Sequence, residues 1–160
     1  MHQNLFELSL SPIPEIERMT ENSIEIGDIP NADSWCNEEN RDEAIRRLVS
    51  TLYTCCPGLV KANLKNGTLT FRTGFKQAWL RNKYEAARAI ARSIARMSEK
   101  EFSNRGASAI LNLKWTMDNE FGTYIYSHED FFAITVDQWV KENKMDGTTW
   151  YVGGIIDWHC

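Results

Sequence analysis

Apolar and polar side chains alternate in several short stretches of the chain, and this pattern predicts strands. The final stretch is apolar on both faces, which is typical of a strand inside a sheet or of one covered on two sides. Pro12 and Pro14 end the first stretch, because proline cannot donate a hydrogen bond to a neighbouring strand. The expected strands are residues 5–10, 23–27, 59–65, 68–72, 123–126 and 148–158.

Other segments place apolar residues three or four positions apart, as one face of a helix does. This spacing predicts helices over residues 38–55, 74–97 and 107–120, with a short one from Thr135 to Asn143. Ser98 and Glu101 form a capping-box pattern, so a new helical turn is expected there. Gly106 is expected to separate that turn from the helix over 107–120, whose apolar stripe contains Ile110, Leu113, Met117 and Phe121.

The Asn66-Gly67 pair between two strand-like stretches is a strong hairpin signal. A two-residue turn there would pair Lys65 with Thr68 and Leu64 with Leu69. It would place Val60, Ala62, Leu64, Leu69 and Phe71 on one face. The opposite face would carry Lys61, Asn63, Lys65, Thr68, Thr70 and Arg72.

These elements predict one α+β domain over residues 1–160, with a mostly antiparallel sheet of five or six strands packed by three or four helices. We find no internal repeat or linker. No apolar run approaches the roughly 20 residues of a bilayer span, and the first residues lack a signal-peptide pattern. The expected location is therefore the cytoplasm, without membrane association.

The net charge of −4 conceals a strong asymmetry along the chain. Residues 1–43 carry 11 acidic and 2 basic side chains, residues 44–100 carry 2 acidic and 12 basic ones, and residues 101–160 carry 9 acidic and 4 basic ones. Such a distribution indicates a charged partner. Alternatively, the acidic and basic segments fold against each other and neutralise locally.

The basic middle segment supplies the candidate binding residues. Arginines recur on one side of the helix over 74–97, and the outer face of the hairpin adds further cations. Together they could contact nucleic-acid phosphates or an acidic protein, whereas the alternative is a solvated helix face in which Glu85 pairs with Arg81 or Arg88. The candidate nucleic-acid-binding residues are Lys61, Lys65, Arg72, Arg81, Arg88, Arg92 and Arg96.

Catalytic signatures are absent from the sequence: it has no phosphate-binding glycine loop, nucleophile elbow or zinc-protease motif. His128 precedes Glu129 and Asp130, which is more typical of a solvated turn than of a general base. Asp157, His159 and Cys160, with Cys36 or Cys55-Cys56, lack the spacing of zinc ligands. We therefore expect no catalytic residue, metal or cofactor. Trp35 and Trp115 are candidate interface anchors.

Two stretches carry a resemblance: Phe6-Glu7-Leu8-Ser9-Leu10-Ser11-Pro12-Ile13-Pro14-Glu15-Ile16-Glu17 and Tyr151-Val152-Gly153-Gly154-Ile155-Ile156-Asp157-Trp158-His159. They resemble uncharacterised small cytosolic proteins encoded on conjugative and other mobile elements of gut-dwelling Gram-positive bacteria. The resemblance implies a setting, because cargo genes of such elements often act on host defence, DNA transfer or regulation. It implies no catalytic residues.

Three functional hypotheses follow. The first is a non-catalytic accessory protein that contacts nucleic acid, or a nucleic-acid-processing protein, through residues 61–96. The second is a protein-interaction module that uses the acidic N-terminal third or an exposed aromatic patch. The third is an enzyme of unrecognised type around His128 or the C-terminal Asp157-His159-Cys160.

Overall fold

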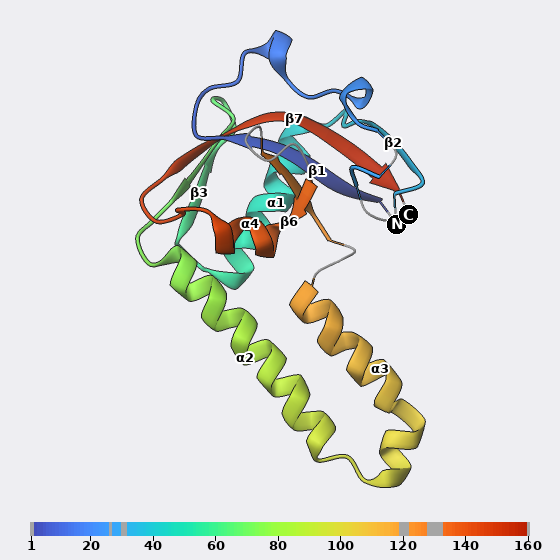
Figure 1. Cartoon of the computed structure of the whole chain (residues 1–160). Coiled ribbons are helices and arrows are strands. Elements are labelled where there is room, and N and C mark those ends of the chain that lie inside the picture. Colours follow the sequence, from blue (N-terminus) through green and yellow to red (C-terminus); the bar gives the residue numbers. More distant parts are fainter. Residues whose placement is uncertain (1, 26, 30–31, 119–121, 128–132, 160) are drawn as a thin grey trace.

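The chain folds into one seven-stranded sheet with helices and a long N-terminal connection packed around it (Figure 1). The computed structural model describes residues 2–25, 27–29, 32–118, 122–127 and 133–159. In chain order the elements are β1 (His2–Ser9), 3₁₀ turns at Glu15–Glu17 and Glu21–Ser23, β2 (Ser34–Asn37), α1 (Arg41–Cys55), β3 (Val60–Asn63), β4 (Thr68–Phe71), α2 (Phe75–Ala95), α3 (Glu99–Asp118), β5 (Tyr124–Ser127), β6 (Ala133–Thr135), α4 (Val136–Glu142) and β7 (Thr149–His159).

The last strand, β7, organises the sheet. Strand β1 runs antiparallel along one edge of β7. The other edge is divided, because β4 pairs with the first part of β7 and β2 pairs with its end. Side chains on both faces of β7 are buried, which confirms the prediction of an inner strand.

The predicted α+β class with a mostly antiparallel sheet is confirmed. The strand order is β3-β4-β7-β1-β5-β6, with β2 beside β7. Among the strands that the structure describes, only β1 and β5 pair in parallel. Seven strands are present where five or six were predicted, and the structure has four helices.

Two apolar clusters cover the two faces of the sheet. Helices α1 and α4, with the first turn of α2, cover one face, where Leu48, Phe75 and Trp139 are buried. The connection between β1 and β2 crosses the other face and buries Met19 and Ile29 against it. Figure 1 shows this connection on the opposite side of the sheet from α1 and α4.

Gly153 and Gly154 lie in the middle of β7, where other parts of the chain approach very closely. A Cβ at Gly153 would meet the Glu7 carboxylate, and one at Gly154 would meet the backbone carbonyl of Met19. The register between β1 and β7 also shifts at this point. Glycine is therefore required here for space, because Glu7 accepts hydrogen bonds from the backbone N–H groups of both Gly154 and Met19.

The hairpin of β3 and β4 exists, but its predicted register is wrong by two residues. Asn63 rather than Lys65 pairs with Thr68, so the loop has four residues instead of two. The Asn63 side chain accepts the Asn66 N–H, and Gly67 turns the chain at φ +60°. Because side chains alternate with period two, a two-residue shift preserves the faces, and Val60, Leu69 and Phe71 are buried as predicted.

Strand β2 was not predicted, and no strand forms at residues 23–25 of the expected strand 23–27. Ser23 closes a 3₁₀ turn with Thr20, and the next residue, Ile24, is buried against the sheet. Strand β2 is mostly exposed and lacks apolar alternation, so its sequence gives no strand signal. Strand β6 was also missed, because it has only three residues.

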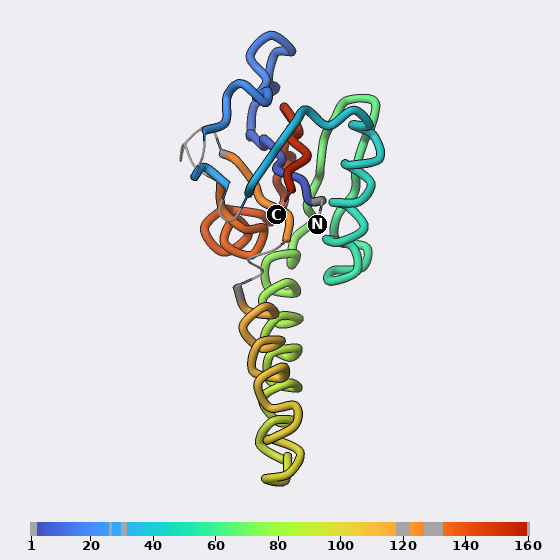
Figure 2. The backbone as a smooth tube through the Cα atoms, turned by 90° about the vertical axis from the view of Figure 1, so that its right-hand side faces the viewer, coloured from blue at the N-terminus to red at the C-terminus, as the bar shows by residue number. Residues whose placement is uncertain are grey.

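Helices α2 and α3 form an antiparallel arm, residues 75–118, that projects from the sheet body (Figures 1 and 2). The predicted capping box starts α3, since the Ser98 hydroxyl accepts the Glu101 N–H at 3.3 Å. The predicted break at Gly106 is wrong, because α3 continues through it. The Phe102 ring lies against Gly106, where a Cβ would come within 2.6 Å of it.

Replacing Gly154 with alanine should strongly destabilise the protein, because the new Cβ would collide with backbone at Met19. We expect the free energy of unfolding to fall by about 3 kcal/mol or more. Gly147→Ala is the control: its Cβ meets nothing within 4 Å, and only its φ of +74° costs about 1–2 kcal/mol. Urea unfolding measures both variants, and equal losses would contradict the close approach.

Candidate functional site

The first residues of the arm are buried in the core of the sheet body, and its tip projects away from that body (Figure 2). Phe75 and Trp79, in the first two turns of α2, are buried in the main core, whereas no later residue of α2 is fully buried. Beyond Trp79, α2 continues for four more turns, in which Lys83 still contacts α4 and the later turns face α3 and solvent. The arm is therefore the part of the molecule whose side chains are most available to a partner.

The buried carboxylate of Asp137, in α4, binds two residues at the base of the arm. The indole Nε1 of Trp79 donates to Oδ1 of Asp137 at 2.8 Å, and Nζ of Lys83 lies 2.8 Å from Oδ2. The same ammonium group sits 5.6 Å from the centre of the Trp79 ring. One carboxylate thus holds two residues on successive turns of α2, which sets the direction of the arm.

The N-terminus of α2 is held by the connection that precedes β7. Gly74 has no side chain to cap the helix, and Asp146 performs this task by accepting the Lys76 N–H at 3.1 Å. Hydrogen bonds from the backbone N–H groups of Lys76 and Gly74 hold the pKa of Asp146 below its usual value. The Lys76 ammonium donates to the carbonyls of Lys141 and Asn143.

The structure divides the seven predicted cations into two groups, all of them exposed. Lys61, Lys65 and Arg72 lie on or beside the β3–β4 hairpin, in the sheet body. The other four are on the arm. We call these four the arginine row: Arg81, Arg88, Arg92 and Arg96.

The arginine row follows the solvent-exposed side of α2, and near the tip of the arm it borders α3. Ala87, Ile90 and Ile94 are half-buried and pack toward α3, whereas the row lies on the opposite side of the helix. Residues 81, 88, 92 and 96 are separated by seven, four and four positions, so they follow one face. The predicted helical stripe of arginines is therefore present on the surface.

No carboxylate pairs with the arginine row among the residues that the structure describes. Glu85 makes no ion pair with Arg81 or Arg88 there, and the Arg88 guanidinium instead lies 5.9 Å from the centre of the Tyr84 ring. The acidic N-terminal connection lies on the far side of the sheet body (Figures 1 and 2). Local neutralisation by that segment does not occur for the row.

Near the tip of the arm, the row borders a shallow hollow of about 530 Å³. Arg92 and Arg96 from α2 line it together with Arg105 from α3. Arg105 is partly compensated, because Glu101 lies 3.3 Å from its guanidinium. The tip is thus the place where positive charge from both helices converges.

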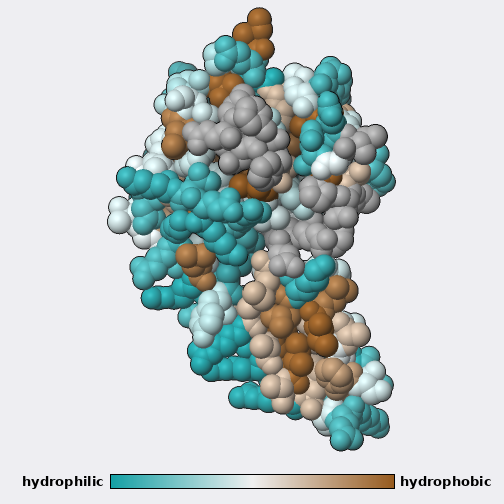
Figure 3. All heavy atoms as spheres, in the orientation of Figure 1, coloured by the Kyte–Doolittle hydropathy of each residue, from teal (hydrophilic) through white to brown (hydrophobic). Residues whose placement is uncertain are grey.

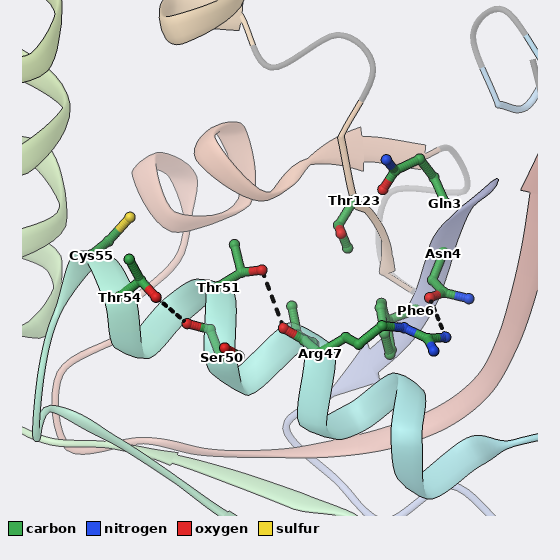
Figure 4. Close-up of a pocket in the computed structure, with 10 residues that line it drawn as sticks. Gln3, Asn4, Phe6, Arg47, Ser50, Thr51, Thr54, Cys55 and Thr123 are labelled. Carbon is green, nitrogen blue, oxygen red and sulfur yellow. Dashed lines mark hydrogen bonds between the residues drawn. The ribbon is translucent and has the colours of Figure 1, made fainter. Parts of the chain in front are cut away.

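A second hollow, of about 630 Å³, lies between α1 and β1 in the body (Figure 4). Its hydroxyl groups are largely engaged within α1, because Thr51 and Thr54 donate to the carbonyls of Arg47 and Ser50. Arg47 itself binds Asn4 and Glu38 at 3.1 and 2.9 Å. The hydroxyl groups of Thr51 and Thr54 and the Arg47 guanidinium are thus already bonded within the chain.

The candidate catalytic residues are not brought together where the structure describes them. His128, Glu129, Asp130 and Cys160 lie outside the described residues. His159 contacts Asp33 at 3.1 Å, and Cys36 lies opposite Asp157 across the strand pair. Burial raises the pKa of the Cys55 thiol and brings that of Cys56 to about 11, which disfavours the nucleophilic thiolate.

The sequence-based stripe on α3 was only partly right. Leu113 packs toward α2, but Ile110 and Met117 are exposed, as are Leu111 and Trp115 on the same helix. A periodic apolar stripe shows that a helix has a contact face, and it does not show whether the chain itself covers that face. Phe121 lies outside the described residues.

No protein-family model, curated protein or solved structure matches this chain. Within the described segments, no cluster of three or more His, Cys, Asp or Glu residues could hold a metal ion. None of the helices seen in these segments has the length and apolarity to cross a bilayer.

Replacing Asp137 with alanine should lower the free energy of unfolding by about 3–5 kcal/mol, because it leaves Lys83 and the Trp79 N–H without their partner. The double variant Asp137→Asn, Lys83→Met should recover part of this loss, since no unpaired charge remains. Chemical denaturation measures both. A loss below about 1 kcal/mol for Asp137→Ala would show that the arm does not depend on this contact.

Proposed function

We propose that this protein is a non-catalytic accessory protein that contacts nucleic acid through the arginine row of the arm. The observation that carries the proposal is a row of four exposed arginines, unpaired among the described residues, on a helix that projects from the body. Phosphate groups are among the partners that guanidinium groups bind most strongly, through paired charge-assisted hydrogen bonds.

The dimensions of the row suit a nucleic-acid backbone. Residues 81 and 96 lie about 22 Å apart along the axis of α2, at 1.5 Å per residue. A duplex of that length carries about 13 phosphate charges. Arginines on one helix face supply phosphate contacts rather than a base-reading code, so binding should depend little on sequence.

The body supports a binding role rather than a catalytic one. Its thiols have raised pKa values, and its polar groove holds groups that are already engaged. The resemblance to proteins of mobile elements supplies a fitting setting, in which cytoplasmic accessory proteins act on transferred DNA. We accordingly place the activity in the cytoplasm.

The acidic N-terminal third remains the alternative binding surface. Several of its carboxylates bond within the chain: Glu38 binds Arg47, Asp33 contacts His159, and Glu7 is buried against β7. Through these contacts the segment helps to cover the sheet. Within the described part of the chain the arginine row makes no ion pair with a carboxylate, and we therefore favour it.

The test compares two triple variants that change net charge equally, from −4 to −7. Arg81, Arg92 and Arg96 are changed to Gln in the first, and Lys61, Lys65 and Arg72 in the second. Arg88 is retained because it lies over Tyr84. Binding of a random duplex and a single strand is measured by fluorescence anisotropy across a salt series.

For the duplex, we expect the first variant to lower the slope of log K against log salt concentration by about 2.7, which is about 0.9 for each lost phosphate contact. The second variant should change the slope by less than about one. Equal effects of the two variants would indicate nonspecific attraction. No binding by the unmodified protein at about 50 mM salt would exclude the proposal.

A further inference from the structure

The arm exposes far more apolar surface than the rest of the molecule. Ten large apolar side chains are exposed among the described residues, and seven of them belong to the arm. The whole of α3 contributes no side chain to either apolar cluster. Large exposed apolar side chains that gather on one part of a molecule mark an interaction site. The seven are Leu80, Tyr84, Phe102, Ile110, Leu111, Trp115 and Met117.

Part of this surface forms a recess at the base of the arm. Leu80 and Tyr84 from α2 and Met117 from α3 line a hollow of about 240 Å³. Ile110 lies two turns from Met117 on the same face of α3, so the apolar surface continues from the recess along the arm. Figure 3 shows hydrophobic residues gathered over α3 on this side of the molecule.

Two cations lie at the recess, whose lining also contains the ion pair of Lys83 with the buried Asp137. Lys141 of α4 lines it and makes no ion pair among the described residues, and Arg88 lies over the Tyr84 ring at its edge. The arm as a whole has nine basic and four acidic residues, a net charge of +5. A second copy of this chain would bring the same positive charge against it, so an acidic partner is more complementary.

The shape of the surface favours a protein partner over a lipid surface. A recess receives a protruding side chain, as the central pockets of protein interfaces do. A membrane-bound helix instead presents a convex apolar face that enters the lipid. Helix-in-groove recognition uses apolar anchors spaced three, four and seven residues apart, and such a helix could follow the direction from Met117 to Ile110.

We propose that the apolar side of the arm, formed by Leu80, Tyr84, Ile110 and Met117, binds an acidic amphipathic helix of a partner protein. One apolar anchor of that helix occupies the recess, and its carboxylates face Lys141 and Arg88. This inference does not depend on nucleic-acid binding, because Arg81, Arg92 and Arg96 lie on a different side of α2. The arm would then hold two partners on two faces.

The test uses synthetic helical peptides of about 18 residues, long enough to form a helix of several turns. Three labelled peptides carry Leu, Phe or Trp as the central anchor, with other apolar positions at helical spacing and Glu elsewhere. A matched set replaces every Glu with Lys. Anisotropy titrations with the full chain give the affinities.

We expect at least one Glu peptide to bind at least about tenfold more tightly than its Lys counterpart, because carboxylates complement the rim. Tyr84→Glu should weaken that binding by about tenfold or more. Tyr53→Glu is the matched control: Tyr53 is 50% exposed on α1 and Tyr84 is 62% exposed, so both changes have the same chemistry. The control should alter affinity by less than twofold. Circular dichroism verifies folding of each variant.

Several results would overturn the proposal: no binding by any Glu peptide, equal binding of Glu and Lys peptides, or equal effects of the two tyrosine variants. Two alternative occupants are tested in parallel. Dimerisation in sedimentation experiments that Tyr84→Glu abolishes would assign the surface to a second copy. Binding to phosphatidylserine vesicles that the same variant abolishes would assign it to a membrane. The triple variant of Arg81, Arg92 and Arg96 should retain peptide binding, so failure of the nucleic-acid proposal would be recognised separately.

Discussion

The rest of the structure depends on the close approach of three chain segments to the centre of β7. The Glu7 carboxylate accepts the N–H groups of Gly154 and Met19, and the Arg41 guanidinium donates to the carbonyls of Val152 and Gly153. These contacts join β1, the N-terminal connection and the start of α1 to one strand. A side chain at Gly154 would push this arrangement apart, so two glycines at one point allow both faces of the sheet to be covered.

The sheet body and the arm are stabilised in different ways. The body buries apolar residues on both faces of the sheet, and its acidic N-terminal connection serves as one of the two covers. Two helices packed only on each other cannot bury all their side chains, so much of the arm surface remains in contact with solvent. The Asp137 carboxylate links the two parts, because it binds Trp79 and Lys83 from within α4.

Sequence reasoning succeeded where local rules act alone. The faces of the β3–β4 hairpin, the capping box at Ser98 and the inner position of β7 all follow from spacing and residue type. It failed where the outcome depends on particular side-chain contacts or on pairing with a distant strand. Strand β2 pairs with the end of β7, the Asn63 side chain holds the four-residue hairpin loop, and α3 continues through Gly106, against which the Phe102 ring lies. The candidate site was predicted in part. The spacing of the arginines predicted their stripe on α2, but the sequence did not show that Lys61, Lys65 and Arg72 lie apart from this stripe, in the sheet body.

The separation of charge follows from the same architecture. The acidic connection between β1 and β2 is held on one face of the sheet by the contact of Glu7 with Met19, and the Asp137 carboxylate holds the base of the basic α2. At a physiological Debye length of about 8 Å, charges at the two ends of the molecule scarcely influence each other. An anionic partner that approaches the arm therefore encounters its local charge of +5 rather than the overall charge of −4. The net charge of the whole chain is consequently a poor guide to the charge that any one part of its surface presents.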